Sequence, residues 1–155
     1  MEIRTLTPKQ LHRIRPKLVR FSRNYGDRRI THRAIRWLRD LHSDPFPEGT
    51  LLAAATEGKR LTGFILFGKF GLEEAYIVVH PKFRNQRVGE TLLEHAIGKL
   101  GKVYTRVACD NIPSLKLCFS MGLQAFHLTT GPTGKPTLCL GGGNWEASEF
   151  FTHIQ

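Results

Sequence analysis

The sequence is short of several features that mark particular classes of protein. It contains three cysteines, Cys109, Cys118 and Cys139, an odd number without a C-x-x-C pair, so we expect neither a disulfide framework nor a zinc site. The seven histidines are scattered, and we expect no metal centre. No apolar run is long enough to span a bilayer, and the first residues lack the apolar segment of a secretory signal. We therefore expect a cytoplasmic protein with no membrane partner.

Acidic residues are also scarce. There are 13 Asp and Glu against 23 Lys and Arg, which gives a net charge of +10. Residues 1–40 hold 12 of the basic residues and only 3 of the acidic ones, so most of the excess lies in this segment. A basic face can attract an anionic partner through its long-range field, but solvated helix faces are the commoner fate of such side chains. We do not expect nucleic acid as a partner, because aromatic residues are not interleaved with the charges and no docking motif is present.

The length and composition are those of one globular domain, which we expect to span residues 1–155. A chain of 155 residues can bury a single core, and 41% hydrophobic with 23% charged residues is typical of a soluble protein.

Two helices are predicted after a short first strand at residues 2–6. Thr7 with Pro8, and later Thr31, have the residue types that begin helices. The hydrophobic pattern then predicts a hairpin at 51–55 and 60–67, a central strand at 73–79, a helix at 88–100, a strand at 103–109, a helix at 112–121 and strands at 124–129 and 136–140. This order predicts an α/β (α+β) fold with a central mixed, mostly antiparallel sheet flanked by helices.

The tail, residues 141–155, opens with three glycines and ends in an aromatic piece. The sequence leaves open whether that piece packs on the sheet or on a second subunit, so a homodimer is one of the two possibilities.

The stretch from Glu73 to Leu93 carries the functional signal. A strand ends at His80-Pro81, a basic turn follows, and a helix begins near Val88. The first N–H groups of a helix have no partner within the helix, and its dipole adds partial positive charge there, so an anion is favoured at this point. Arg84 and Arg87 add full charges, and Gly89 lets a ligand approach the backbone closely. These features predict a ligand that carries phosphate.

The run VHPKFRNQRVGETLL at residues 79–93 resembles the acyl-CoA-binding signature of the GNAT superfamily of N-acetyltransferases, a hydrophobic strand followed by [RQ]-x-x-G-x-[GA]. Residues 111–114 and 121–123 match the later N-x-x-[AS] and x-G-[FL] parts of the pattern. The resemblance implies the acyl-CoA N-acyltransferase fold, acetyl-CoA as the acyl donor and no metal. It implies these binding residues: Ile77, Val78, Val79, Arg84, Asn85, Gln86, Arg87, Val88, Gly89, Glu90, Asn111 and Ser114.

The sequence departs from the signature at two positions: the first glycine is Arg87, and the usual tyrosine is Cys118. Arg87 either keeps a backbone contact to the pyrophosphate in a helical conformation or marks a damaged loop, and we favour the contact. Cys118 is either the proton donor to the leaving thiolate or a small buried hydrophobe. Asn111 suits both a hydrogen bond to pantetheine and a helix cap.

Transfer of an acyl group to an amine requires removal of a proton from the ammonium form. Glu73 has the spacing from Arg84 at which relatives similar to histone acetyltransferases carry their general base, so we predict Glu73 rather than Glu74. The predicted function is transfer of an acetyl group from acetyl-CoA to the primary amine of a small molecule or protein. The alternatives are a non-catalytic acyl-CoA-binding module and, last, a nucleic-acid binder. A basic N-terminal segment disfavours a polycationic acceptor and favours one that bears a carboxylate or phosphate.

Overall fold

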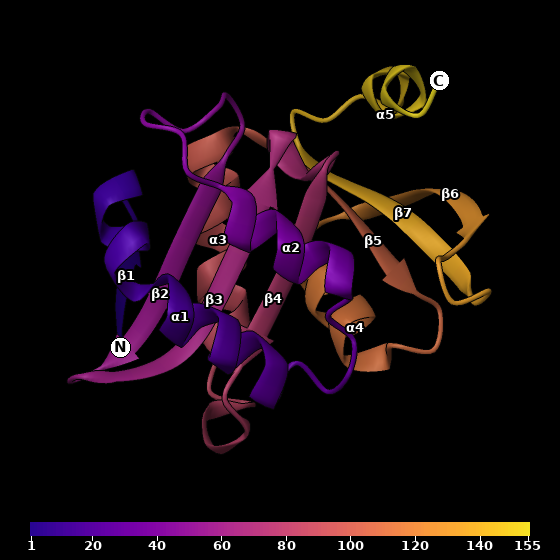
Figure 1. The fold of residues 1–155 in the computed structure, drawn as a ribbon. Helices are drawn as coiled ribbons and strands as arrows, with labels where there is room; N and C mark the ends of the chain where they lie inside the picture. Colours follow the sequence, from indigo (N-terminus) through magenta and orange to yellow (C-terminus); the bar gives the residue numbers. More distant parts are fainter.

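The structure is a computed structural model that describes residues 1–155. The chain forms seven strands and five α-helices (Figure 1). Their bounds are β1 Glu2–Thr5, α1 Pro8–Tyr25, α2 His32–Asp40, β2 Leu51–Glu57, β3 Arg60–Gly68, β4 Glu74–Val79, α3 Val88–Leu100, β5 Lys102–Ala108, α4 Ile112–Ser120, β6 Gln124–Thr130, β7 Pro136–Gly143 and α5 Ala147–His153. Short 3-10 turns, Lys69–Gly71 and Pro81–Phe83, lie on either side of β4. The mixed fold and the order of the elements are as predicted.

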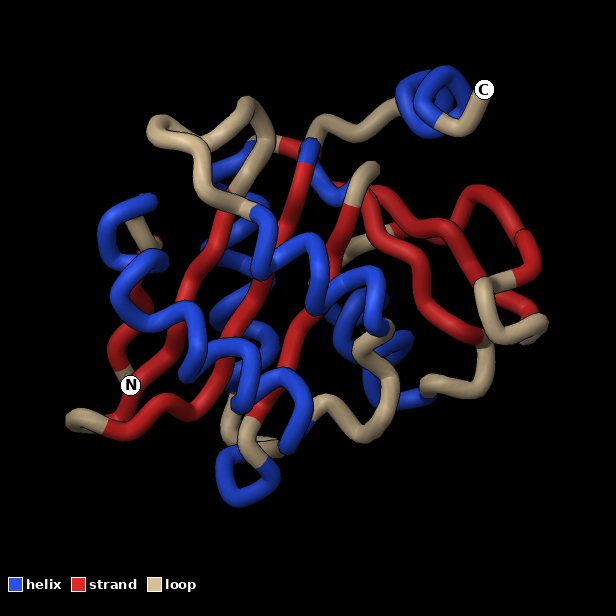
Figure 2. Tube along the Cα trace, in the orientation of Figure 1, coloured by secondary structure: helices blue, strands red, loops and turns tan.

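The strands form two sheets rather than the one predicted from the sequence. One sheet has the order β1-β2-β3-β4 and the other has the order β5-β7-β6, and every pairing is antiparallel. Figure 2 shows the second sheet turning away from the first beyond β4. Because β4 pairs only with β3, its other edge is free at the centre of the molecule.

Helices cover both faces of the first sheet. Helices α1 and α2 lie on one face and α3 lies behind the other (Figure 1). Along β4 the side chains alternate between these layers: Tyr76 and Val78 pack with the residues of α1 and α2, whereas Ala75, Ile77 and Val79 pack with those of α3 and α4. Neither layer holds a helix that combines the length and apolarity required to cross a membrane.

The two predicted helix starts are confirmed. The Thr7 hydroxyl accepts a hydrogen bond from the Gln10 backbone at 3.2 Å, and the Gln10 side chain accepts one from the Thr7 backbone at 2.8 Å, which completes a capping box. Thr31 caps α2 in the same way by accepting from the backbone N–H of Ala34 at 3.0 Å.

The C-terminal segment packs on its own chain. Gly141, Gly142 and Gly143, predicted to open a tail, instead complete β7, where they pair with the start of β5. A side chain at Gly141 would collide with Trp145, whose ring stacks on Phe126 at 4.9 Å. Helix α5 follows and buries Phe150 against Tyr104 and Cys139 of the second sheet. The aromatic piece therefore packs on a sheet of its own chain, and the homodimer stays a prediction.

Candidate functional site

The free edge of β4 is the starting point of the site. The N–H of His80 donates to the carbonyl of Thr62 at 2.8 Å, and the β3–β4 register then runs without a shift from Val79 back to Glu74. In an antiparallel ladder only alternate residues face the partner strand, so the backbone groups of Ala75, Ile77 and Val79 point away from β3. These groups are free because no strand pairs with this edge of β4.

A cavity of about 170 Å³ occupies the gap between β4 and β5. Its walls come from six parts of the chain. These are residues 75–77 of β4, residues 105–108 of β5, Ile65 and Phe67 of β3, Leu93 of α3, Arg29 and Ile30 of the α1–α2 loop, and Asn111, Ser114, Leu117 and Cys118 in and before α4. The wall is mostly apolar, with a few polar groups, which is the usual character of a small-molecule site.

A loop with unpartnered N–H groups lies next to this cavity, because a Cβ at Gly89 would come within 3.3 Å of Leu117 and 3.7 Å of Ile77, two residues of the cavity wall. The amides of Lys82, Phe83 and Arg84 are bonded within the turn that follows His80. The amides of residues 85–90 donate to no protein acceptor, and α3 begins in the middle of this run at Val88. A series of free N–H groups at the start of a helix favours an anion, as predicted from the sequence.

Two residues of this loop have the left-handed backbone conformation, Asn85 with φ 62° and Arg87 with φ 65°. This corrects the expectation that Arg87 is helical: it is the residue before the helix, and its conformation is one that glycine adopts without strain. The left-handed turns bring successive N–H groups to the same side of the chain, which is the geometry of an anion-binding nest. Arg87 adopts this geometry although the left-handed conformation strains the backbone of a non-glycine residue.

The Arg84 side chain binds to other parts of the protein. Its Nε donates to the carbonyl of Val79 at 3.1 Å and its Nη2 to the carbonyl of Tyr25 at 3.0 Å, while Nη1 pairs with Asp27 at 3.0 Å. The sequence suggested that Arg84 adds charge for a phosphate. The structure shows it joining the end of β4 to the α1–α2 loop, so Arg87 is the arginine of this loop whose guanidinium has no protein partner.

Residues 14–123 match the acetyltransferase (GNAT) family. This chain belongs to the GNAT acetyltransferase family. No curated protein matches it in sequence.

Solved structures of other acetyltransferases share the fold. The aminoglycoside 6'-acetyltransferase type Ii has a TM-score of 0.71 and 15% identity, with 94% of this chain and 99% of that chain covered. The ribosomal-protein-S18-alanine N-acetyltransferase from Escherichia coli has a TM-score of 0.64 and 17% identity, covering 94% and 98%. A putative acetyltransferase from Salmonella typhimurium, solved with its cofactor acetyl-CoA, has a TM-score of 0.62 and 17% identity, covering 94% of each chain.

The two glutamates at the start of β4 differ in environment in this GNAT protein. Glu73 lies just before the strand, is exposed, and accepts a hydrogen bond from Trp37 Nε1 at 3.3 Å. Glu74 is the first strand residue and is half-buried. Burial raises the pKa of Glu74, opposed by the backbone of Ala75 and by the charges of Arg33 and Arg106. A carboxyl with a raised pKa is the better-matched general base at neutral pH.

Cys118 forms part of the cavity wall, and its side chain is buried. Burial raises the pKa of its thiol to about 11. The thiol thus stays protonated at neutral pH, but transfer of its proton to a thiolate of ordinary basicity, with a pKa of about 8.5, runs uphill. This environment matches the interpretation of Cys118 as a small buried hydrophobe.

The other predicted binding residues lie in three places. Ile77 of β4 and Asn111 and Ser114 at the start of α4 line the cavity, and Asn111 also caps α4 by accepting from the Ser114 backbone at 3.5 Å. Gln86, Val88, Gly89 and Glu90 belong to the free-amide run, and the side chain of Gln86 donates to the carbonyl of Lys82 at 3.1 Å. Val78 does not face the site: its side chain is buried in the layer under α1 and α2, and its backbone faces β3. The Val79 carbonyl accepts from Arg84.

Most of the cavity wall was not predicted from the sequence, including Arg29, Tyr76 and Arg106. Tyr76 donates to or accepts from Ser22 Oγ at 3.0 Å, and burial raises the pKa of its phenol to about 12. Arg29 pairs with Asp110 at 2.8 Å, and Asp110 also pairs with Lys135 of the β6–β7 hairpin at 2.9 Å. These two pairs join three loops beside the cavity. No signal in the sequence predicts them, because each depends on contacts between distant segments.

The structure has no group of three or more His, Cys, Asp or Glu side chains placed to hold a metal ion.

Proposed function

We propose that this protein transfers an acetyl group from acetyl-CoA to a primary amine. The observation that carries the proposal is the run of free amides at residues 85–90, which leads to a cavity beside the free edge of β4. These residues fit a diphosphate joined to a narrow pantetheine arm: the amides and Arg87 would hold the diphosphate, and Asn111 and Ser114 would bond to the arm. Acetyl-CoA supplies the acetyl thioester.

Side-chain and backbone groups of β4 would act at different steps of the transfer. The acceptor amine must lose a proton before its nitrogen can attack the thioester carbonyl, and we assign that proton to Glu74, with the sequence-predicted Glu73 as the competing base. As the new C–N bond forms and the C–S bond breaks, negative charge develops first on the carbonyl oxygen. The outward-facing N–H groups of Ile77 and Val79 would stabilise this charge.

The leaving thiolate finally takes up a proton. With its pKa raised to about 11, Cys118 is a weak donor. We propose that the thiolate takes up the second proton of the attacking nitrogen, which becomes acidic once the C–N bond has formed, either directly or through water. The role of Cys118 as an acid, predicted from the sequence, remains the alternative that mutation can test.

A second candidate function is an acyl-CoA-binding module without catalysis. It is favoured by the presence of Cys118 where GNAT enzymes usually have a tyrosine, and by the high pKa of the thiol. The two candidates share the CoA site and differ only in turnover.

Two measurements separate the candidates. Thermal unfolding with acetyl-CoA at 100 times its dissociation constant should gain about 2.7 kcal/mol of stability in either case. Release of free CoA thiol, measured with a panel of small amines and peptides, should occur only for the enzyme. Stabilisation without thiol release supports the binding module, and the absence of stabilisation at saturating acetyl-CoA contradicts both.

A further inference from the structure

Arginines gather beside the cavity on the side covered by α2. Arg106 of β5 and Arg29 of the α1–α2 loop line the cavity, and Arg33 lies in the first turn of α2, directly after that loop. The charges of Arg33 and Arg106 both act on Glu74. Helix α2 lies against the start of β4, where Trp37 Nε1, one helical turn after Arg33, donates to Glu73 at 3.3 Å. Arg106 lines the cavity together with Ala75 and Tyr76, the two residues that follow Glu74. We call the surface formed by Arg33, Glu74 and Arg106 the acceptor mouth.

The positive charges of the acceptor mouth exceed its negative charge. Arg29 is paired with Asp110, but neither Arg33 nor Arg106 forms an ion pair, and both are exposed. The guanidinium of Arg106 lies over the ring of Phe150 at 5.1 Å, which fixes its position without using its N–H groups. Glu74, which is half-buried and forms no ion pair, is the proposed base.

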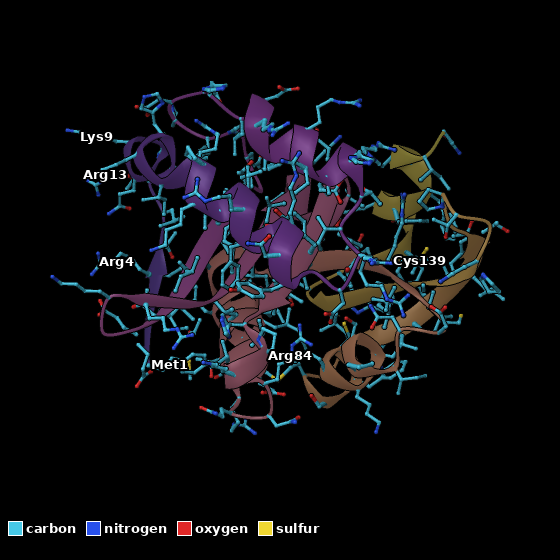
Figure 3. The ribbon with its side chains drawn as sticks, turned by 60° about the horizontal axis from the view of Figure 1, so that its bottom comes forward. Met1, Arg4, Lys9, Arg13, Arg84 and Cys139 are labelled. Carbon is cyan, nitrogen blue, oxygen red and sulfur yellow. The ribbon has the colours of Figure 1, made fainter.

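The surface around the mouth has the same sign. The outward faces of α1 and α2 carry exposed cations that form no ion pairs: Lys9, Arg13, Lys17, Arg20, Arg23, Arg36 and Arg39. They recur at intervals of three or four residues, so like charges are neighbours along each helix and repel one another. Lys9 and Arg13 extend away from the molecule in Figure 3. This field repels a polycation and attracts an anionic group.

We propose that the acceptor is a small amino carboxylate, such as a free amino acid, whose carboxylate is bound by Arg33 and Arg106 while its ammonium group faces Glu74. The proposal rests on the proposed acetyl transfer and names its substrate class. Arginine forms two parallel N–H···O bonds to a carboxylate, and the pairing of one carboxylate with two guanidiniums fixes both position and orientation. The amine is then placed at the base, so the anionic group contributes to the rate as well as to affinity.

The test compares acceptors that differ only in the anionic group. Thiol release from acetyl-CoA is measured with amino acids and with their α-carboxamides, with O-phosphoethanolamine and ethanolamine, and with spermidine. For the best amino acid we expect kcat/KM at least about tenfold above that of its carboxamide, since a charge-assisted bond is lost. The phosphate pair distinguishes a general requirement for an anion from a preference for carboxylate. Added salt should reduce the ratio.

Variants assign the effect to named residues. Arg33→Gln and Arg106→Gln should each lower the ratio of carboxylate to carboxamide kcat/KM toward one, and Arg106→Lys should keep part of it. Arg39→Gln is the matched control, because Arg39 is an exposed arginine of the same helix at a distance from the mouth, and it should leave the ratio unchanged. Both arginines of the mouth are exposed, so these variants should fold.

The outcomes separate this inference from the proposed function. If carboxamides, ethanolamine or spermidine are acetylated as well as or better than the amino carboxylates, the inference is overturned and the acetyltransferase stands. If acetyl-CoA neither binds nor reacts, the proposed function itself fails. If acetyl-CoA binds but no acceptor reacts, the test is thermal stabilisation of the CoA-loaded protein by the product analogues. The inference is supported if N-acetyl amino acids stabilise the protein more than N-acetyl amino amides do, and if this stabilisation is lost in Arg106→Gln. Equal or absent stabilisation by the two overturns it.

Discussion

Arg84 and Asp27 form an ion pair of 3.0 Å between the loop that precedes α3 and the α1–α2 loop. The same guanidinium also bonds to the carbonyls of Tyr25 and Val79, so one side chain links the end of α1, the end of β4 and the free-amide run. The α1–α2 loop in turn contributes Arg29 and Ile30 to the cavity wall. The position of Arg84 therefore connects the proposed donor site to the proposed acceptor site.

Replacing Arg84 by Gln should loosen the α1–α2 loop more than it destabilises the whole protein. The ion pair is exposed, so we expect a global loss of only about 1 kcal/mol. Hydrogen exchange of the amides at residues 25–30 should become faster, because their tether to β4 is lost. In steady-state assays KM should rise for both substrates.

The nearby Lys82→Gln is the control for Arg84→Gln, since the Lys82 side chain is exposed and makes no ion pair. Arg84→Lys should behave almost like Arg84→Gln, because an ammonium group cannot reproduce the fork that reaches three acceptors. Unchanged exchange at residues 25–30 in Arg84→Gln would contradict the linking role.

Replacing Arg87 by Gly should stabilise the protein. A left-handed non-glycine residue is strained, and glycine removes that strain at a smaller entropic cost, so we expect a gain of up to about 1 kcal/mol in urea unfolding. Asn85→Gly tests the same conformation at a residue type that tolerates it better, and should gain less. The free amides remain in both variants, so acetyl-CoA should still bind, and Arg87→Gly should bind it more weakly if the side chain contacts a phosphate. A loss of stability in Arg87→Gly would mean that the backbone there is not left-handed.

Glu74→Gln should lower kcat/KM by about 100-fold or more, whereas Glu73→Gln should change it by less than about threefold. Since burial raises the pKa of Glu74, its carboxyl stays protonated to higher pH than an ordinary glutamate and accepts the amine's proton only above that pKa. The rate of the wild-type protein should therefore rise with pH through this pKa, and the rise should persist in Glu73→Gln but not in Glu74→Gln.

The raised pKa of Glu74 also makes the free energy of unfolding depend on pH. A carboxyl whose pKa is raised by folding binds more protons in the folded state, so its contribution to stability falls as pH rises through the raised pKa. Glu74→Gln should then be more stable than the wild type at neutral pH, although it is less active. The opposite pattern, with Glu73→Gln inactive and Glu74→Gln active, would restore the assignment made from the sequence.

Cys118→Ala should affect packing more than catalysis. The buried thiol fills the cavity wall, and its removal should cost about 1 kcal/mol in urea unfolding with kcat reduced less than about threefold. Cys139→Ala is the matched control, because Cys139 is also buried but packs in a different hydrophobic cluster from Cys118. A fall in kcat of tenfold or more in Cys118→Ala alone would identify the thiol as the proton donor.

The sequence predicted those features of the fold that depend on residues close together in the chain. Thr7 and Thr31 are helix caps because their hydroxyls reach amides three residues away, and the hydrophobic pattern located the strands and helices to within a few residues. The glycine run 141–143 was misassigned because its pairing partner is the start of β5, some forty positions earlier in the chain. Glycine is needed there because a side chain at Gly141 or Gly142 would collide with Trp145 or Leu123, so the run is part of a packed strand and not of a flexible tail.

The candidate site was predictable where it follows a contiguous motif. The free amides after Pro81 and the cavity position of Asn111 agree with the pattern read from residues 79–93 and 111–114. The engagement of Arg84 with Asp27 and the presence of Arg106 in the wall are contacts between segments that no local rule relates. The conformation of Arg87 was mispredicted because glycine usually marks a left-handed residue and here arginine adopts it.

The central claim is that the amides of residues 85–90 bind the diphosphate of acetyl-CoA while the free edge of β4 lies along its thioester. Amide-resolved NMR titration of the protein labelled with nitrogen-15 tests both parts at once. With acetyl-CoA, the largest shifts should fall on residues 85–90, Ile77 and Val79, and with pantetheine, which has no diphosphate, the shifts at 85–90 should disappear while those of β4 persist. If saturating acetyl-CoA leaves the amides of residues 85–90 unshifted, the account is contradicted.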